Sequence, residues 1–334
     1  MSGDLVLGLD LGGTGCRALL ADTTGQRHGE GYAGPANPCS SPPGVAAATL
    51  GDALAGALAG TDPDAVLAGV AGIAGYAALS DPGTRGLFDL AWARAGLRCP
   101  MRVRPDCEAA FAAGTPGAAG ALLVAGTGSM AAAIEARRVA TRTGGHGWLL
   151  GDEGSGFWLG REAVRAALGA LQRRHPTAGL LDDVLDDLLA GAARDRDPLV
   201  TLDAATAAVY RQAPIRLAGY APLVCGAAAR GDPVADGLVA RAATLLADAV
   251  LPLCRPGLPV VLAGGLLTGD LTGGTVGARV RQHLTAEGTT DVVTGPDAAA
   301  GAAWLAILDA GTADPVAAHD RLTRGRPEST NGCP

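Results

Sequence analysis

The amino-acid sequence predicts an α/β protein made of two similar halves with a cleft between them. Strand-like apolar segments occur in two clusters, within residues 5–33 and within residues 121–142, and helical segments follow each cluster. Both clusters open with a glycine-rich turn that joins two strands. Because this pattern occurs twice in one chain, we expect two halves of similar construction.

The first half is expected at residues 1–117. Short apolar runs predict its strands, at 5–10, 17–22, 26–33, 65–71 and 101–104. Apolar residues at helical spacing predict its helices, at 45–60, 82–96 and 106–113, with Asp106 as the cap of the last one.

The second half is expected at residues 118–297. Its strands are predicted at 121–125, 130–136, 139–142, 259–263 and 291–294. Helical sequence dominates between them, at 155–252 and 271–287, and a last helix is expected at 298–310. Residues 312–334 are polar and contain Arg, Gly and Pro, which is typical of a flexible tail.

The composition excludes several classes of nucleotide enzyme. The chain has 334 residues, 48% of them hydrophobic and 18% charged, as in a globular protein with a large core. All 26 basic residues are arginine, so the chain has no lysine for a P-loop, a protein-kinase strand or a Schiff base. The net charge of −7 disfavours a nucleic-acid partner.

The termini and cysteines indicate a cytoplasmic protein. Residues 1–10 lack the basic start and apolar run of a signal peptide. The uncharged stretch 109–134 contains Pro116 and several glycines, so we expect a helix end, a loop and a strand rather than a membrane span. The seven cysteines are scattered without metal-like spacing, which favours free thiols in a reducing compartment.

The first glycine turn lies in the segment LGLDLGGTGCR at 7–17. Its backbone amides at Gly12, Gly13 and Thr14 can present donors to phosphate oxygens, and Asp10 can hold a hydrated Mg²⁺. Arg17 is the nearest cation to this turn. The G-x-G-x-x-G spacing of a dinucleotide site is absent, and an ordinary hairpin turn is the alternative interpretation.

Two later turns repeat this chemistry. The segment VAGTGS at 124–129 again places a glycine turn between strands and offers phosphate contacts from Gly126, Thr127, Gly128 and Ser129. In VVLAGGLL at 260–267, Gly264 and Gly265 would let a flat ring approach the backbone closely.

These three turns, in this order, resemble those of the actin-like ATPase superfamily of sugar kinases, Hsp70 and actin. The segment GGHGWLLGDEGSGFWLG at 144–160 is similar to the G-D-E-G-S segment of the N-acetylglucosamine kinase branch of the BadF/BadG/BcrA/BcrD ATPase family. GPANP at 34–38 is similar to the G-P-S-N-P loop of that branch. The resemblance implies two actin-like (ribonuclease H-like) domains with a nucleotide and sugar cleft between them, the first completed by the helix at 298–311.

The resemblance also implies roles for single residues. Asp106 matches the catalytic base, although from the residues alone a helix N-cap is the other interpretation. The sugar-side positions of the branch match Asn37, Gly144, Gly145, Asp152 and Glu153. Glu153 is alternatively the acidic first turn of the following helix. Pro105 replaces an Asn usual in the branch and His146 replaces a Trp, so the sugar pocket is expected to differ.

The implied function is an ATP- and Mg²⁺-dependent kinase that phosphorylates an amino sugar, N-acetylglucosamine first, on its 6-hydroxyl. Glucosamine, N-acetylmuramic acid or a related sugar or cyclitol are alternative acceptors. A dehydratase activator ATPase or a non-catalytic sugar sensor are alternatives of another class. The resemblance also allows a homodimer.

Overall fold

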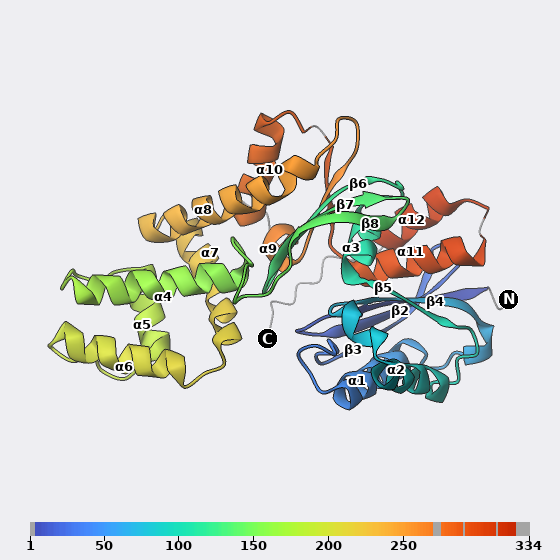
Figure 1. Cartoon of the computed structure of the whole chain (residues 1–334), viewed down its shortest axis with the longest axis horizontal. Coiled ribbons are helices and arrows are strands. Elements are labelled where there is room, and N and C mark those ends of the chain that lie inside the picture. Colours follow the sequence, from blue (N-terminus) through green and yellow to red (C-terminus); the bar gives the residue numbers. More distant parts are fainter. Residues whose placement is uncertain (1–3, 270–274, 290, 312, 325–334) are drawn as a thin grey trace. The chain divides into compact units, whose positions relative to one another are not determined.

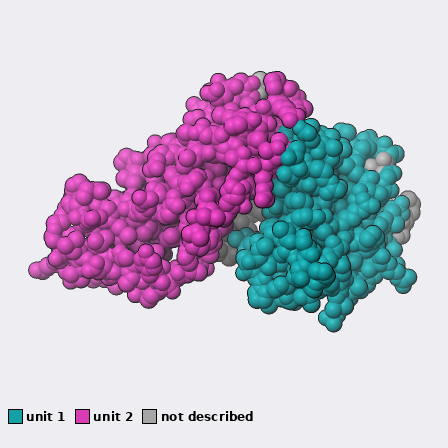
Figure 2. Space-filling view, viewed as in Figure 1, with its two compact units in different colours: residues 1–120, 134–140, 293–334 teal, residues 121–133, 141–292 magenta. Residues whose placement is uncertain are grey.

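The computed structural model describes residues 4–269, 275–289, 291–311 and 313–324. The chain divides into two compact units (Figure 2). Unit 1 consists of residues 1–120, 134–140 and 293–334, and unit 2 of residues 121–133 and 141–292. The chain contains two five-stranded sheets with helices, so the predicted α/β class is confirmed. All strands of the first sheet lie in unit 1.

The first sheet has the strand order β3-β2-β1-β4-β5. Its strands are β1 (Leu5–Leu11), β2 (Cys16–Asp22), β3 (Arg27–Ala33), β4 (Val66–Ile73) and β5 (Met101–Pro105). The hairpins β1–β2–β3 are antiparallel, whereas β1, β4 and β5 are parallel. β1 is central and buried on both faces, as its almost continuous apolar sequence requires.

Helices cover both faces of this sheet (Figure 1). Helices α1 (Pro43–Ala57) and α2 (Pro82–Arg94) pack with Leu7, Leu9 and Leu11 on one face. Helices α3 (Asp106–Gly114) and α11 (Ala298–Ala310) pack with Val6 and Val70 on the other. Successive strand residues alternate between faces, so Asp10 lies on the same face as Val6, toward α3 and α11.

The second sheet has the strand order β10-β9-β6-β7-β8. Its strands are β6 (Gly120–Ala125), β7 (Ser129–Glu135), β8 (Arg138–Gly144), β9 (Val260–Ala263) and β10 (Val292–Gly295). β6 and β9 pair in parallel, with Ala121 opposite Val260. The glycine turns after β6 and β9 therefore both lie at the carboxyl ends of these two parallel strands.

Helices supply most of unit 2 (Figure 1). They are α4 (Gly156–Gln172), α5 (Leu180–Leu188), α6 (Pro198–Tyr210), α7 (Ala221–Ala229), α8 (Pro233–Val250), α9 (Gly265–Thr268) and α10 (Val276–Ala286). Residues 271–274 of the helix expected at 271–287 lie outside the described residues. Short 3₁₀ helices occur at Pro63–Ala65, Tyr76–Ser80, Pro214–Tyr220 and Leu251–Leu253.

The expectation of a flexible tail from residue 312 onward is wrong for part of that segment. Pro315–Arg324 forms helix α12, in which Ala318, His319 and Leu322 are buried. Ala318 and Leu322 are four residues apart, so they share one face of the helix, and the polar residues around this short stripe obscure it in the sequence. Residues 312 and 325–334 lie outside the described residues.

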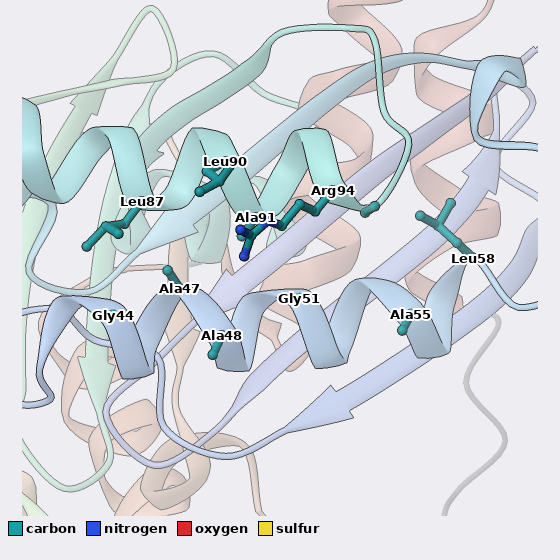
Figure 3. A pocket seen from close by; sticks show the side chains of 11 residues that line it. Gly44, Ala47, Ala48, Gly51, Ala55, Leu58, Leu87, Leu90, Ala91 and Arg94 are labelled. Atoms are coloured by element: carbon teal, nitrogen blue, oxygen red, sulfur yellow. The ribbon is translucent and has the colours of Figure 1, made fainter.

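A groove of about 500 Å³ runs between α1 and α2 of unit 1. Figure 3 shows Leu87, Leu90 and Arg94 of α2 beside small residues of α1. None of the residues predicted for the active site lines this groove.

Among the described helices, none combines the length and the apolarity that crossing a bilayer requires.

Candidate active site

The first glycine turn joins β1 to β2 in unit 1 and presents free backbone donors. The amide of Gly12 donates to the carbonyl of Gly15 (2.9 Å), and the amide of Ala36 donates to the carbonyl of Gly12 (3.1 Å). Gly13 and Thr14 are exposed, and their amides find no acceptor in the described parts of the chain. These two amides can therefore bind an anionic oxygen without breaking an existing bond.

Asn37 lies beside this turn. A β-carbon added to Gly13 would lie 4.0 Å from Asn37 Nδ2. The Oδ1 atom of Asn37 accepts a hydrogen bond from the amide of Cys39 (2.8 Å), which orients the side chain. The structure thus brings a residue predicted for sugar binding next to one predicted for phosphate binding.

Asp10 lies near the end of β1, and Asp106 directly follows β5, a parallel strand of the same sheet. The pKa of Asp10 is raised to about 7, by burial first and then by the charges of Asp106 and Asp297, while Arg17 opposes the shift. Burial also raises the pKa of Asp106, against the hydrogen bond that the Cys107 amide donates to its carboxylate (2.9 Å). A carboxyl with a raised pKa suits proton exchange near neutral pH.

Asp106 is not the N-cap of its helix, which corrects the sequence-based expectation. Helix α3 begins at Asp106, and the capping position is occupied by Pro105, which has no side-chain cap. Pro105 closes β5 with extended backbone, as a proline at a strand end does. The carboxyl of Asp106 accepts from the Cys107 amide at the start of the helix through Oδ1, and no hydrogen bond to its Oδ2 occurs among the described residues.

Arg17 is held in a closed ring of four ion pairs. Its two terminal nitrogens pair with Glu30 and Asp297, each at 3.0 Å. Arg27 pairs with the same two carboxylates, at 3.0 and 2.8 Å. The guanidinium of Arg17 also lies 5.2 Å from the ring centroid of Tyr32. Arg17 was predicted to contact the phosphates of ATP, but both of its terminal nitrogens are paired with carboxylates. A phosphate contact would require Arg17 to break these ion pairs.

Sequence reasoning missed the other three members of this ring. Asp297 is 4% exposed and caps α11 by accepting from the Ala300 amide (3.2 Å). An Asp directly before an alanine run is a capping signal, but it does not indicate a partner some 280 residues away. Only the folded sheet places the start of α11 next to β2.

The second glycine turn joins β6 to β7 in unit 2. The carbonyls of Gly126 and Thr127 accept from the amides of Gly156 and Phe157 at the start of α4, at 2.8 and 3.1 Å. Within the described residues, the amides of Thr127 and Gly128 have no acceptor. This turn therefore repeats the donor arrangement of the first one on a firmly bonded backbone.

The segment at 144–153 folds back onto this second turn. The amide of Ser129 donates to Asp152 Oδ1 (3.1 Å) and its hydroxyl donates to the Glu153 carbonyl (3.0 Å), while the Gly145 amide donates to the Ser129 carbonyl (3.1 Å). A β-carbon on Gly128 would lie 2.7 Å from Asp152 Oδ2, so a side chain there would force the Asp152 carboxylate to move. These hydrogen bonds connect Ser129, predicted to bind phosphate, to Asp152 and Gly145, predicted to bind the sugar.

Asp152 is buried and adopts a left-handed backbone conformation, with φ of +58°. Burial raises the pKa of its carboxyl, and the Ser129 amide and the charge of His146 lower it. Glu153 is exposed, and its carboxylate lies 3.7 Å from Arg161 of α4. Trp148 stacks against Phe157 of the same helix at 5.5 Å, which anchors the middle of the segment.

Gly264 and Gly265 follow β9 and differ in role. Gly264 has φ of +87°, and a β-carbon there would lie 2.4 Å from the Ala125 carbonyl oxygen, so this glycine permits contact between the turns after β9 and β6. Gly265 opens α9, is exposed, and faces open space. Binding of a flat ring at these two glycines stays a prediction.

The described residues contain no group of three or more His, Cys, Asp or Glu side chains with the geometry of a metal site. Asp10 and Asp106 nevertheless interact electrostatically in a site rich in carboxylates. That donor set fits a hydrated Mg²⁺ held through water better than a fully protein-bound ion.

The model of the BadF/BadG/BcrA/BcrD ATPase family matches residues 7–306 of the chain. The chain belongs to this family. Membership in this ATPase family implies ATP binding, in agreement with the two turns that carry free amides.

Two curated kinases resemble parts of this family member. The N-acetylmuramic acid/N-acetylglucosamine kinase of Clostridium acetobutylicum is 37% identical over 83 residues, 25% of this chain and 27% of that protein. The N-acetyl-D-glucosamine kinase of Dictyostelium discoideum is 29% identical over 173 residues, 49% of this chain and 52% of that protein. The matched segments thus span about a quarter and about half of these two relatives.

A solved structure from Chromobacterium violaceum, provisionally named an N-acetylglucosamine kinase, is similar over a longer range. The TM-score is 0.69 at 27% identity, covering 92% of this chain and 100% of that chain. The family and fold expected from the glycine turns and the G-D-E-G-S segment are therefore confirmed.

Proposed function

We propose that this protein is an ATP-dependent kinase that transfers the γ-phosphoryl group to the 6-hydroxyl of N-acetylglucosamine. The observation that carries the proposal is the buried Asp106 carboxyl with its raised pKa, beside Asp10 at the end of the first sheet. Three similar proteins that are named as N-acetylglucosamine kinases suggest the class of acceptor.

Asp106 is the proposed base. It accepts the proton of the sugar hydroxyl while that oxygen attacks the γ-phosphorus and the bond from this phosphorus to the bridging oxygen of ADP breaks. Burial raises the pKa of the Asp106 carboxyl and so favours its holding this proton. The free amides of Gly13, Thr14, Thr127 and Gly128 are the proposed phosphate donors. Bound Mg²⁺ would offset phosphate charge, with Asp10 holding it through water.

Each unit carries polar groups that are proposed sugar ligands. Asn37 keeps its Nδ2 group available in unit 1, while unit 2 supplies Asp152 and the backbone of Gly144 and Gly145. Carboxylate and amide groups of this kind recognise adjacent sugar hydroxyls. Glucosamine, N-acetylmuramic acid and cyclitols offer similar hydroxyls and stay alternative acceptors.

The deciding experiment measures ADP release with ATP and Mg²⁺ across these sugars, for the wild type and for Asp106→Ala. We expect N-acetylglucosamine to give the highest kcat/KM, and Asp106→Ala to lower kcat by roughly 10²–10⁴-fold with ATP affinity retained, because only the base is lost. Asp81→Ala is the matched control, since Asp81 only caps α2 through the Thr84 amide (2.8 Å).

Near-normal turnover of Asp106→Ala would contradict the assignment of the base. ATP binding without turnover of any sugar would contradict the kinase and favour the sugar sensor, and coloured protein with an iron–sulfur spectrum would favour the dehydratase activator. The cytoplasmic location, the homodimer and the lack of a nucleic-acid partner stay predictions.

A further inference from the structure

We propose that Ser129 is a positioning residue that couples nucleotide binding at the second glycine turn to sugar binding at the segment 144–153. This inference rests on the proposed function for the identity of the two ligands. It concerns unit 2 alone, where the turn and the segment are both found.

Ser129 uses its hydrogen-bonding groups on the segment rather than on a phosphate. Its carbonyl receives the Gly145 amide at one end, and its amide and hydroxyl reach Asp152 and Glu153 at the other. An amide that already donates to a carboxylate is not free for a phosphate oxygen. The amides of Thr127 and Gly128, which have no acceptor among the described residues, are left for that task.

Asp152 depends on this support. A non-glycine residue with φ of +58° is held in a conformation that costs free energy and persists only where its surroundings impose it. The Ser129 amide donates to one carboxylate oxygen, and a β-carbon added to Gly128 would lie 2.7 Å from the other, so this oxygen packs close to the turn. A shift of the turn backbone therefore moves the carboxylate proposed to bind the sugar.

The segment has few other anchors in its exposed part. Leu149 and Leu150 are 74% and 77% exposed, and between Gly145 and Asp152 the side-chain anchor is the stacking of Trp148 on Phe157. Phosphate binding that immobilises the turn would also immobilise both ends of the segment through Ser129. The sugar would then lose less conformational entropy on binding, which is positive cooperativity.

The test is calorimetric titration of N-acetylglucosamine with and without saturating AMP-PNP and Mg²⁺. For the wild type we expect the nucleotide to strengthen sugar binding about fivefold or more, with the same factor for AMP-PNP when the sugar is present. Ser129→Ala removes the hydroxyl bond to the Glu153 carbonyl and keeps both backbone bonds, so it should lower this factor about twofold or more without abolishing it. Ser129→Thr restores the hydroxyl and should recover the coupling.

Thr143→Ala is the matched control, because Thr143 is an exposed hydroxyl residue of β8 just before the segment. It should keep the wild-type factor. Full coupling in Ser129→Ala, or equal loss in Thr143→Ala, would overturn the proposal.

Hydrogen exchange of the wild type with AMP-PNP and Mg²⁺ alone tests the same coupling without the sugar. We expect slower exchange at the Gly145 and Ser129 amides, and unchanged exchange would contradict the coupling even if Ser129→Ala fails to fold. If no amino sugar binds the wild type, the proposed function fails, and this nucleotide-only measurement still decides the role of Ser129.

Discussion

The buried carboxyl of Asp10, which is proposed to hold Mg²⁺, lowers the stability of the folded protein when it is charged. Its pKa in the folded protein is about 7, well above the value of about 4 for an exposed Asp, because it is buried near Asp106 and Asp297. The folded state therefore binds more protons than the unfolded state between these two values. Stability falls as pH rises from about 4 to about 7, and above pH 7 the charged Asp10 carries its full cost.

We expect Asp10→Asn to stabilise the protein by a few kcal/mol at pH 8 and by much less at pH 4, because the amide removes the buried charge. The same change should abolish Mg²⁺-dependent turnover. Urea unfolding at the two pH values and the ADP-release assay check both effects. Asp52→Asn, at an exposed position of α1, is the control and should alter neither. A variant destabilised at pH 8 would contradict the burial of charge.

Arg17 illustrates a residue whose role follows from its partners. Its side chain is 13% exposed and its partner Asp297 is 4% exposed, so removing Arg17 takes one of two guanidinium partners from a buried carboxylate and leaves it with Arg27. We expect Arg17→Met to lower the free energy of unfolding by about 2–4 kcal/mol in urea titrations. Arg165→Met, which removes an exposed guanidinium 3.2 Å from Glu162, should cost at most about 1 kcal/mol.

The kinetics of Arg17→Met separate the two interpretations of this residue. If the ring of ion pairs is its role, we expect the KM for ATP to change little in folded variant protein. A large rise in the KM for ATP with unchanged stability would instead support the phosphate contact predicted from the sequence.

Helix α12 shows how an element outside the predicted fold contributes to it. Leu322 is fully buried in the hydrophobic cluster that includes α11, and its carbonyl accepts from Arg27 Nε (3.0 Å). Val316 on the same helix is 56% exposed. We expect Leu322→Ala to cost about 2–4 kcal/mol, because it leaves a cavity. Val316→Ala should stay within about 0.5 kcal/mol. Equal effects of the two variants in urea unfolding would contradict the docking of α12.

The whole molecule contains separate cores in its two units. One cluster of buried residues lies entirely in unit 2, and two clusters on either face of the first sheet lie in unit 1. Cores that share no buried residue can unfold independently, so a single two-state transition is not expected.

We expect differential scanning calorimetry to resolve two transitions. Leu322→Ala should lower the midpoint of one, and Leu185→Ala, at a fully buried position of unit 2, should lower the other. A single transition with equal calorimetric and van't Hoff enthalpies, shifted by both variants, would contradict this independence.

Most local structure was predictable because it depends on near neighbours. Alternating or continuous apolar runs located the strands around Asp10 and Gly126, and helical spacing located the helices that cover them. Asp232 caps α8 by accepting from the amides of Val234 and Ala235, an arrangement that depends only on adjacent residues. The short stripe of α12 was missed because its two buried aliphatic residues lie among polar ones.

Residues alone thus determined the α/β class, the glycine turns with their amide donors and the exclusion of lysine-based phosphate sites, since each follows from short-range backbone geometry or composition. The tertiary structure decided which side chains act on one another. It placed Asp297 against Arg17, raised the pKa of Asp10 by burial, and turned Ser129 toward Asp152. Burial and contacts between distant segments arise only when sheets and helices pack, so no local pattern in the sequence encodes them.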